Sequence, residues 1–469
     1  RHYNAPMAGS FIVGQREGAE AGAAMFQGGG NAVDAAVTAA LVAGVVALPS
    51  CGIGGYGGAL VIGLHTGKVT SIDFNTEAPS NPPANPPDHG WLSAGTPGTL
   101  AGLDLALHRY GTRTLRQCLQ PAIRLITEGF PVTAAIEGSI KRYAKILLAD
   151  PGSAALLLPG GQPLKAGATF RNPGLAAMLE SFARDNSTDA FYRGPIARRI
   201  AEAFAKGGGT LSEKDLNSYE ARELTPLQVR VGAYDVFTTP LASGGATALQ
   251  ALASIQHLSF EESRRKSHAR VEALRLAWQD RLSLFGDPRF VDVPMRQLLS
   301  DDYAAISAAR ARKAVHAAQP LVLPENKYTS SGTIHISAFD AQGNACSITL
   351  THGDGFGACV TVPGLGLILG HGVSRFERTP GHPNAVGPLK SPVHNMCPVV
   401  VTRDRRPVLA IGGTGGKRIP SAVFDVLASH LIEKMPLGAA VTAPRIVTTG
   451  GLALTLNERW SEPDRAHFA

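Results

Sequence analysis

Residues 332–351 predict a loop-to-strand junction followed by a β-hairpin, and this segment constrains the fold more than any other. In Gly332-Thr-Ile-His-Ile-Ser-Ala338, apolar residues alternate with polar ones, as on a strand with one buried face. Asp340-Ala-Gln-Gly-Asn344 predicts a turn, and residues 345–351 predict a second strand. A loop with two prolines is expected over residues 319–331. The Gly332–Thr333 bond is therefore expected where a loop enters a strand.

Thr333 is a candidate nucleophile at this junction. A threonine hydroxyl is a poor nucleophile unless a base removes its proton. If the chain is cut before Thr333, the freed α-amine can be that base. On this segment alone, an ordinary strand threonine is the simpler interpretation.

Composition narrows the class of protein. The chain has 469 residues, of which 44% are hydrophobic, and this length alone suggests two or three domains. The net charge is +7 without a run of five basic residues, which favours a local site for an anionic substrate over a nucleic-acid surface. The five scattered cysteines predict neither a zinc site nor a disulfide framework, and no metal or organic cofactor is expected.

The longest apolar run, residues 35–49, is short for a membrane span and predicts a buried helix, so no membrane partner is expected. The compartment stays open, with a cytoplasmic location as the default. Residues 100–260 are expected to be mainly helical, with amphipathic stretches near 115–128, 173–185 and 196–206, and a further helix is expected over 269–285.

Two glycine-rich segments differ in what they predict. Residues 52–58 follow a helix and precede a strand, the reverse of the order in nucleotide-binding loops, so close backbone packing is the better interpretation. Residues 412–418 join a strand expected at 407–411 to a helix expected at 421–433. Backbone N–H groups at such a junction can bind a phosphate or an oxyanion, and a simple tight turn is the alternative.

Residues 370–376 and 394–398 place one guanidinium, of Arg375, and two imidazoles, of His371 and His394, in a glycine-rich part of the chain. An Arg fork is always charged and suits a substrate carboxylate. The alternative, favoured without further context, is a surface Arg375 paired with Glu377 or Asp354.

Taken together, these motifs resemble the gamma-glutamyltransferase family in content and in order. They are residues 29–36, 52–55, 276–288, 333–335, 343–344 and 412–419. The resemblance implies an N-terminal-nucleophile (Ntn) hydrolase with an α+β fold, a four-layer αββα sandwich. It further implies self-cleavage into a large subunit, 1–332, and a small subunit, 333–469. The two subunits would form one structural domain. This expectation replaces the two or three domains suggested by the chain length.

The same resemblance assigns the chemistry residue by residue. Thr333 matches the nucleophile, and its new α-amine the general base. Thr351 matches the threonine that hydrogen-bonds the nucleophile and assists maturation. Gly415 and Gly416 match the pair whose N–H groups form the oxyanion hole.

The family's residues that hold the glutamyl group are replaced in this sequence. Asn75 stands where the family has an Arg for the α-carboxylate, and Gly353 where it has an Asn. Arg375 replaces the Asp that holds the α-ammonium, and His394-Asn395 replaces a Ser-Ser pair. Because Arg375 would repel an ammonium group, glutamyl transfer from glutathione is not expected. The short segment 376–396 predicts a more open site, which favours hydrolysis over transpeptidation.

We therefore expect an enzyme that cleaves itself at Gly332–Thr333 and hydrolyses a carboxylate-bearing, non-glutamyl amide or keto acid through an acyl-Thr intermediate. Arg375, His394 and His371 are expected to orient the substrate carboxylate. The alternatives are a glutaryl-type acylase, a C–C bond hydrolase releasing an oxalyl-type group in alkylproline antibiotic biosynthesis, a true gamma-glutamyl transferase, and an inactive binding homologue. The expected partners are a small anionic substrate and the two subunits of one precursor, with a homodimer of the processed unit also allowed.

Overall fold

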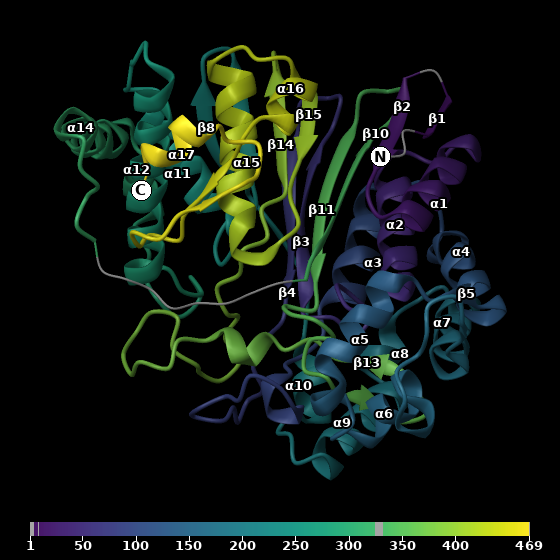
Figure 1. Cartoon of the computed structure of the whole chain (residues 1–469). Helices are drawn as coiled ribbons and strands as arrows, with labels where there is room; N and C mark the ends of the chain where they lie inside the picture. The colour runs from purple at the N-terminus through teal and green to yellow at the C-terminus, as the bar shows by residue number, and fades with distance from the viewer. Residues whose placement is uncertain (1–3, 8, 324–331, 469) are drawn as a thin grey trace.

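Two β-sheets face each other in the computed structural model, and helices cover the outer side of each sheet (Figure 1). The structure describes residues 4–7, 9–323 and 332–468. Residues 324–331 of the loop expected at 319–331 lie outside the described residues. The layer order is helix, sheet, sheet, helix, which confirms the predicted α+β fold and αββα sandwich.

The first sheet has seven antiparallel strands in the order β1-β2-β10-β11-β3-β4-β7. Their bounds are Asn4–Met7 (β1), Ser10–Val13 (β2), Ile334–Phe339 (β10), Ala345–Thr351 (β11), Gly57–Gly63 (β3), Val69–Asn75 (β4) and Arg222–Leu224 (β7). β10 and β11 form the expected hairpin, with Ile334 opposite Leu350 and Phe339 opposite Ala345.

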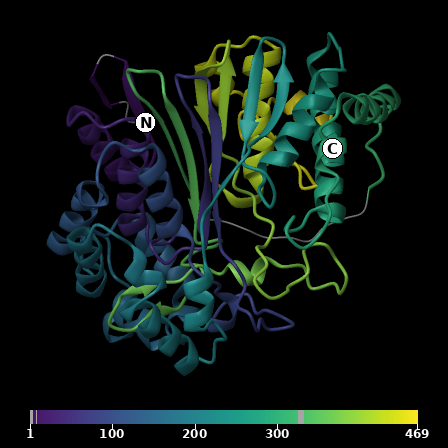
Figure 2. The same cartoon turned by 180° about the vertical axis from the view of Figure 1, so that it is seen from behind.

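The second sheet has four antiparallel strands in the order β15-β14-β9-β8. Their bounds are Arg406–Ile411 (β15), Val399–Arg403 (β14), Tyr234–Thr238 (β9) and Leu227–Val231 (β8). Figure 2 shows β8 and β9, in teal, beside β14 and β15 on this side of the molecule. Val61 and Phe339 of the first sheet pack with Val400 of the second, so the two inner faces share a small apolar core.

Strands β7, β8 and β9 correct the sequence-based expectation, which treated residues 100–260 as mainly helical and gave no strand at 222–238. Val229, Val231 and Val236 are buried on one face and alternate with polar residues. The strands are short, and β9 pairs with β14, about 160 residues further along the chain. Long-range pairing of this kind leaves little local signal.

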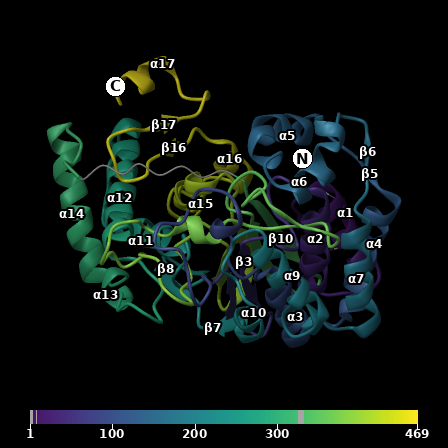
Figure 3. The same cartoon turned by 90° about the horizontal axis from the view of Figure 1, so that it is seen from below.

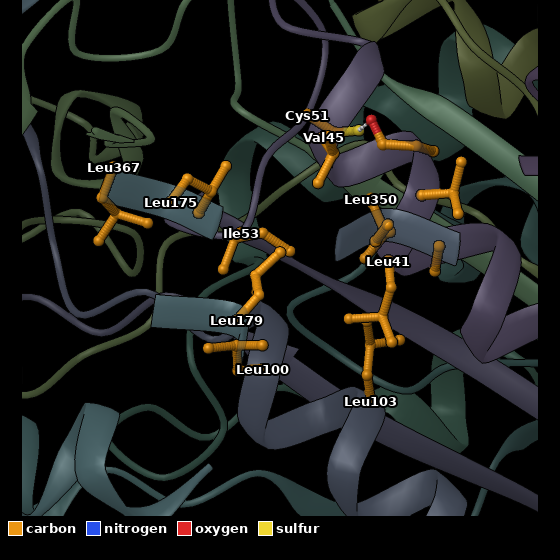
Figure 4. Close-up of a cluster of buried hydrophobic side chains, with 14 of the residues drawn as sticks. Leu41, Val45, Cys51, Ile53, Leu100, Leu103, Leu175, Leu179, Leu350 and Leu367 are labelled. Carbon is orange, nitrogen blue, oxygen red and sulfur yellow. Dashed lines mark hydrogen bonds between the residues drawn. The ribbon is translucent and has the colours of Figure 1, made fainter. Parts of the chain in front are cut away.

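The outer layer on the first sheet is built around α2, which is buried along its whole length. Asn31 and Asp34 form a capping box at its start, which satisfies otherwise unpaired N–H groups. Leu41 of α2 lies near Leu350 of β11 and Leu103 of α3 in this buried cluster, and Val45 of α2 lies beside Cys51 (Figure 4). The helices of this side are α1 (Arg16–Gln27), α2 (Ala32–Val46), α3 (Thr99–Tyr110), α4 (Leu115–Glu128), α5 (Ala134–Leu147), α6 (Pro151–Leu157), α7 (Pro173–Asp185), α8 (Asp189–Tyr192), α9 (Pro195–Lys206) and α10 (Glu213–Ser218).

The outer layer on the second sheet consists mainly of α11, α12 and α15 (Figure 1). The helices of this side are α11 (Gly245–Ile255), α12 (Ser263–Leu284), α13 (Met295–Leu298), α14 (Asp301–Ala317), α15 (Ile419–Leu427), α16 (Leu437–Thr442) and α17 (Glu462–Ala466). From below, the C-terminal segment with β16 (Ile446–Val447), β17 (Thr455–Leu456) and α17 lies beside α12 (Figure 3). The buried Arg275 of α12 donates to the Gly451 carbonyl at 3.0 Å and fastens this segment.

The stretches before and after Gly332 are interleaved in both sheets. β10 and β11 lie between β2 and β3 in the first sheet, and β14 pairs with β9 in the second. Neither stretch therefore contains a complete sheet of its own.

The glycines of residues 52–58 allow close packing, as predicted. A Cβ on Gly52 would lie 2.6 Å from the His352 ring, and a Cβ on Gly57 would lie 2.1 Å from the Phe74 carbonyl oxygen. Gly57 also has a φ of +118°, which favours glycine. The segment brings the chain tightly against the end of β11. Among the described residues, no helix combines the length and apolar character that a membrane crossing requires.

Candidate active site

Thr333 lies at the entrance to β10, in the middle of the first sheet. Ile334, Ile336 and Ala338 of this strand are buried against the helical layer, so the intervening Thr333 and His335 face the second sheet. Only 8% of Thr333 is exposed. The nucleophile predicted from sequence thus lies at the inner face, immediately before a central strand.

Hydroxyl groups gather around the carbonyl oxygen of Gly332. The Thr333 hydroxyl lies 2.5 Å from this oxygen, and the Thr351 hydroxyl donates to it at 2.6 Å. The two Oγ1 atoms are 3.3 Å apart, and the Gly353 N–H donates to Thr351 Oγ1 at 2.7 Å. Thr351 therefore polarises the carbonyl that Thr333 would attack, while Gly353 fixes the Thr351 hydroxyl. Gly332 has a φ of +89°, a conformation that favours glycine at this bond.

A small cavity of about 20 Å³ lies beside Thr333. Segment 352–398 crosses below the sheets at this end of the molecule (Figure 1). The cavity brings together seven of the residues predicted from sequence, and four others that sequence reasoning missed. The predicted ones are Thr333, Thr351, Gly353, Arg375, His394, Asn395 and Gly416; the others are Tyr56, Val393, Met396 and Ile419. Tyr56 lies between glycines of segment 52–58, which was interpreted only as a packing element.

Arg375 is half-buried at the end of a 3₁₀ turn, Gly372–Arg375, and it lines the cavity. Its guanidinium donates to the Gly353 carbonyl. Arg375 is thus half-buried, whereas the alternative placed it on the surface in a pair with Glu377 or Asp354. A charged fork is thereby placed in the same cavity as Thr333.

His371 lies behind the cavity wall. Its Nδ1 donates to the Gly357 carbonyl at 2.9 Å, and its ring would be 2.8 Å from a Cβ on Gly353. Burial and the nearby Arg375 hold the pKa of His371 well below its usual value, so the ring is neutral. The ring therefore backs Gly353 from behind, and His371 is not among the residues that line the cavity.

Asn75 ends β4 and is also outside the cavity lining. Its side-chain amide donates to the Pro392 carbonyl at 2.8 Å, and 2% of the residue is exposed. It supports the segment that leads to Val393 and His394. The structure thus places Asn75 behind the site, where the sequence interpretation placed it at the substrate.

The glycine-rich turn after β15 reaches the cavity at Gly416. Gly415 and Gly416 have φ values of +118° and +61°, and a 3₁₀ turn, Gly416–Arg418, leads into α15. Gly415 is not among the lining residues. Gly412 lies on the His335 ring, which would be 2.3 Å from a Cβ at that position. The turn is therefore seated on the same strand that carries Thr333.

The potential metal ligands of the described residues do not form a cluster. Within residues 4–7, 9–323 and 332–468, no three His, Cys, Asp or Glu side chains gather so that they could hold a metal ion. The five cysteines are free and buried.

Comparison with known proteins decides the family. The family model "Gamma-glutamyltranspeptidase" matches residues 18–463. This chain belongs to the gamma-glutamyltranspeptidase family. The resemblance found in the sequence is thereby confirmed, and the chain is an Ntn hydrolase.

Two members of the family that carry different names are similar to this chain to nearly the same degree. A glutathione hydrolase proenzyme of Pseudomonas sp. (strain A14) is 33% identical over 93% of this chain and 81% of its own length. An Acylase ACY 1 proenzyme of Pseudomonas sp. (strain V22) is 32% identical over 92% of this chain and 81% of its own. The crystal structure of cephalosporin acylase from Bacillus halodurans superposes with a TM-score of 0.91 at 27% identity, covering 100% of this chain and 88% of the other. Similarity alone therefore does not choose the substrate.

Proposed function

We propose that this protein is made as a precursor, cleaves its own Gly332–Thr333 bond, and then hydrolyses amides or keto acids whose acyl part carries a carboxylate and no α-ammonium group. One observation carries the substrate assignment: Arg375 lines the same cavity as Thr333, and among the described residues that line it none is Asp or Glu. An ammonium group would meet a cation there and no anionic partner.

Self-cleavage begins with attack of Thr333 Oγ1 on the carbonyl carbon of Gly332. The Thr351 hydroxyl, 2.6 Å from the carbonyl oxygen, stabilises the charge that develops on it. The hydroxyl proton passes to the nitrogen, directly or through water, and the C–N bond breaks. An ester now joins Gly332 to Thr333 Oγ1, and the nitrogen leaves as the free α-amine. Water hydrolyses the ester, which gives a carboxylate at Gly332 and a free Thr333 hydroxyl.

In turnover, the Thr333 amine accepts the hydroxyl proton, directly or through water, as Oγ1 attacks the substrate carbonyl. N–H groups of Gly415 and Gly416 stabilise the oxyanion, and a donor of this kind contributes about 2.7–4 kcal/mol where it has been removed. The intermediate collapses, the leaving group takes the proton, and an acyl ester remains on Thr333. Water hydrolyses this ester and restores the amine and the hydroxyl.

Arg375 has the charge and the planar fork that suit the acyl carboxylate. His394 and Asn395, also in the cavity lining, are the polar neighbours that complete its binding site. His371 acts from behind Gly353, by keeping the wall in place.

Intact-protein mass spectrometry tests the maturation step. Freshly purified wild type should give two fragments with a new N-terminus at Thr333, whereas Thr333→Ala should remain one chain of about 49 kDa. A wild type that stays whole after long incubation contradicts the proposal and favours a non-catalytic homologue.

Three anilides of similar size then test the substrate class: glutaryl, gamma-glutamyl and butyryl. The glutaryl compound should have the highest kcat/KM, and Arg375→Asp should abolish its use. Arg378→Asp is the matched control, because Arg378 is exposed and pairs with the exposed Asp88 at 3.1 Å. Preference for the gamma-glutamyl compound would show that the exclusion of an α-ammonium group is wrong. Turnover of the glutaryl compound by Arg375→Asp would show that the carboxylate assignment is wrong. Oxalyl-type keto acids form a second panel for the C–C bond alternative.

A further inference from the structure

Arg281 of α12 is a buried cation directly behind the cavity, and the proposed mechanism does not use it. Only 6% of the residue is exposed. Its guanidinium donates to the His394 carbonyl at 2.8 Å and to Asn395 Oδ1 at 2.9 Å, and a longer bond of 3.4 Å reaches the Ser243 carbonyl. The guanidinium also lies over the Trp278 ring, 5.2 Å from its centroid. Two of these contacts are to His394 and Asn395, which are polar residues of the cavity lining.

The contact with Asn395 determines which end of that amide is left for a ligand. An amide has one acceptor oxygen and one donor NH₂ group. Because Arg281 can only donate, it takes the Oδ1 end. Asn395 lines the cavity, so the NH₂ group is the end that remains for substrate.

The backbone of His394 is fastened on both sides. Its N–H donates to the Ala242 carbonyl at 2.9 Å, and its carbonyl accepts from Arg281. The ring is oriented as well, because Nδ1 accepts from the Met396 N–H at 3.2 Å. A neutral imidazole that accepts at Nδ1 carries its proton at Nε2.

Nε2 of His394 is thus a donor, and it has no hydrogen-bond partner among the described residues although the residue is only 5% exposed. Burial, together with the charge of Arg281, lowers the pKa of His394 to about 3, so the ring stays neutral at physiological pH. A buried donor without a partner is rare in proteins unless a ligand or water satisfies it. His394 lines the cavity, where a ligand can do so.

We infer that Arg281 is a positioning residue that fixes His394 and Asn395 as hydrogen-bond donors, and that this donor-only wall selects acyl groups ending in a carboxylate. This inference rests on the proposed function and deepens it. A carboxylate has only acceptors to offer and can satisfy both donors as well as Arg375. An ammonium group has only donors, so it leaves His394 Nε2 and the Asn395 amide unpaired, which is how a polar site rejects the wrong group.

The test compares Arg281→Lys with Arg275→Lys. Lysine keeps the charge but cannot hold the carbonyl and the amide with a planar fork. Arg275 is the matched control because it is a buried arginine on the same helix, and it pairs with Glu272 at 2.9 Å. Completeness of self-cleavage and the circular dichroism spectrum establish that each variant is folded.

Steady-state kinetics with the glutaryl and butyryl anilides provide the first readout. Arg281→Lys should raise KM for the glutaryl compound at least tenfold, with kcat within about threefold of wild type, and leave the butyryl compound unchanged. Arg275→Lys should preserve the preference between the two. If Arg281→Lys keeps the wild-type ratio of glutaryl to butyryl kcat/KM, or loses both substrates equally, the positioning role is wrong.

Calorimetric binding of glutarate to the Thr333→Ala chain provides a second readout that needs no turnover. Adding Arg281→Lys should weaken glutarate binding at least tenfold, and adding Arg275→Lys should not. Failure of wild type to hydrolyse any anilide, with glutarate binding still dependent on Arg281, would overturn the proposed function and support this inference. If wild type is active but Arg281→Lys leaves the glutarate affinity unchanged, the proposed function stands and this inference is wrong.

Discussion

At the scale of single residues, the hydrogen bonds of Thr351 distinguish it from Thr333. Thr351 donates to the Gly332 carbonyl oxygen, and the Gly353 N–H holds the Thr351 hydroxyl in that direction. The two threonines share one carbonyl, but only Thr333 can attack its carbon. Thr351 is thus expected to control the rate of maturation.

Replacing Thr351 tests this division of labour. Thr351→Val keeps the shape but removes the donor, and should slow self-cleavage about 10²–10³-fold, the usual loss for one oxyanion donor. Thr351→Ser should restore most of the rate because its hydroxyl can still donate. Cleavage is followed on denaturing gels from freshly refolded precursor. Equal rates for the valine and serine variants would show that the hydroxyl has no part in maturation.

Sequence position selected most of the residues that line the cavity. Thr333 and Gly416 belong to contiguous motifs, whereas Thr351 and Arg375 were selected only by their place in the family pattern, and all four line the cavity. Tyr56 and Val393 reach it through packing, which sequence spacing does not reveal. Asn75 was selected by its position in a motif, but a hydrogen bond to Pro392 turns its amide away from the cavity lining.

At the scale of elements, β10 joins the nucleophile to the glycine-rich turn. His335 lies two residues after Thr333 on the same face of the strand. Its ring nitrogens lie 2.9 Å from Thr349 Oγ1 and 2.9 Å from Ser337 Oγ, so the ring is held upright between the sheets. Gly412 packs directly on this ring. We propose that His335 acts as a spacer that fixes the position of the turn relative to the strand.

Loss of the spacer should reduce chemistry rather than binding. His335→Ala leaves a gap under Gly412, so the turn can sink and the Gly416 N–H loses its alignment with the oxyanion. We expect kcat to fall about 10- to 100-fold with little change in KM, since misplacement by about 1 Å can cost that much. His108→Ala, at an exposed position on α3, is the control and should stay within threefold of wild type. A His335→Ala enzyme with normal kcat would exclude the spacer role.

Elements differed in how well the sequence predicted them. The amphipathic helices α4, α7 and α9 match the predicted stretches closely, because each has its own apolar face and a start signal: Thr114, Asn172 and Pro195, respectively. β8 and β9 form a local hairpin, but each has only five residues, and β9 is completed by pairing with the distant β14. Local pattern was sufficient for long amphipathic helices, and insufficient for such short strands.

At the scale of the whole molecule, interleaving explains how a cut at Gly332 can leave a single particle. β10 and β11 are central strands of the first sheet, hydrogen-bonded to β2 on one side and to β3 on the other. Cleavage at the start of β10 breaks no strand pairing. The two predicted subunits would therefore remain one unit until the sheets themselves unfold.

The core also contains neutral histidines, which tie stability to pH. His352 follows Thr351, is fully buried against Gly52, and has no hydrogen-bond partner on either ring nitrogen among the described residues. Burial lowers its pKa to about 3, from 6.5 in an unfolded chain. Between these two values the unfolded chain binds the proton more tightly. Neutral His352 therefore makes its full contribution to the free energy of unfolding above pH 6.5. This contribution is lost as pH falls toward 3.

Replacing His352 by leucine should remove this part of the pH dependence. In the Thr333→Ala background maturation cannot vary. There, the free energy of unfolding of His352→Leu, relative to that of its parent, should rise by about 1.4 kcal/mol for each pH unit below 6.5. At pH 4.5 that amounts to about 2–3 kcal/mol relative to the difference at pH 7.5. Urea unfolding at both pH values measures it. His108→Leu, at an exposed position on α3, is the control for replacing a histidine by leucine at the surface. Parallel pH curves for His352→Leu and its parent would mean that this histidine is already protonated, or solvated, in the folded core.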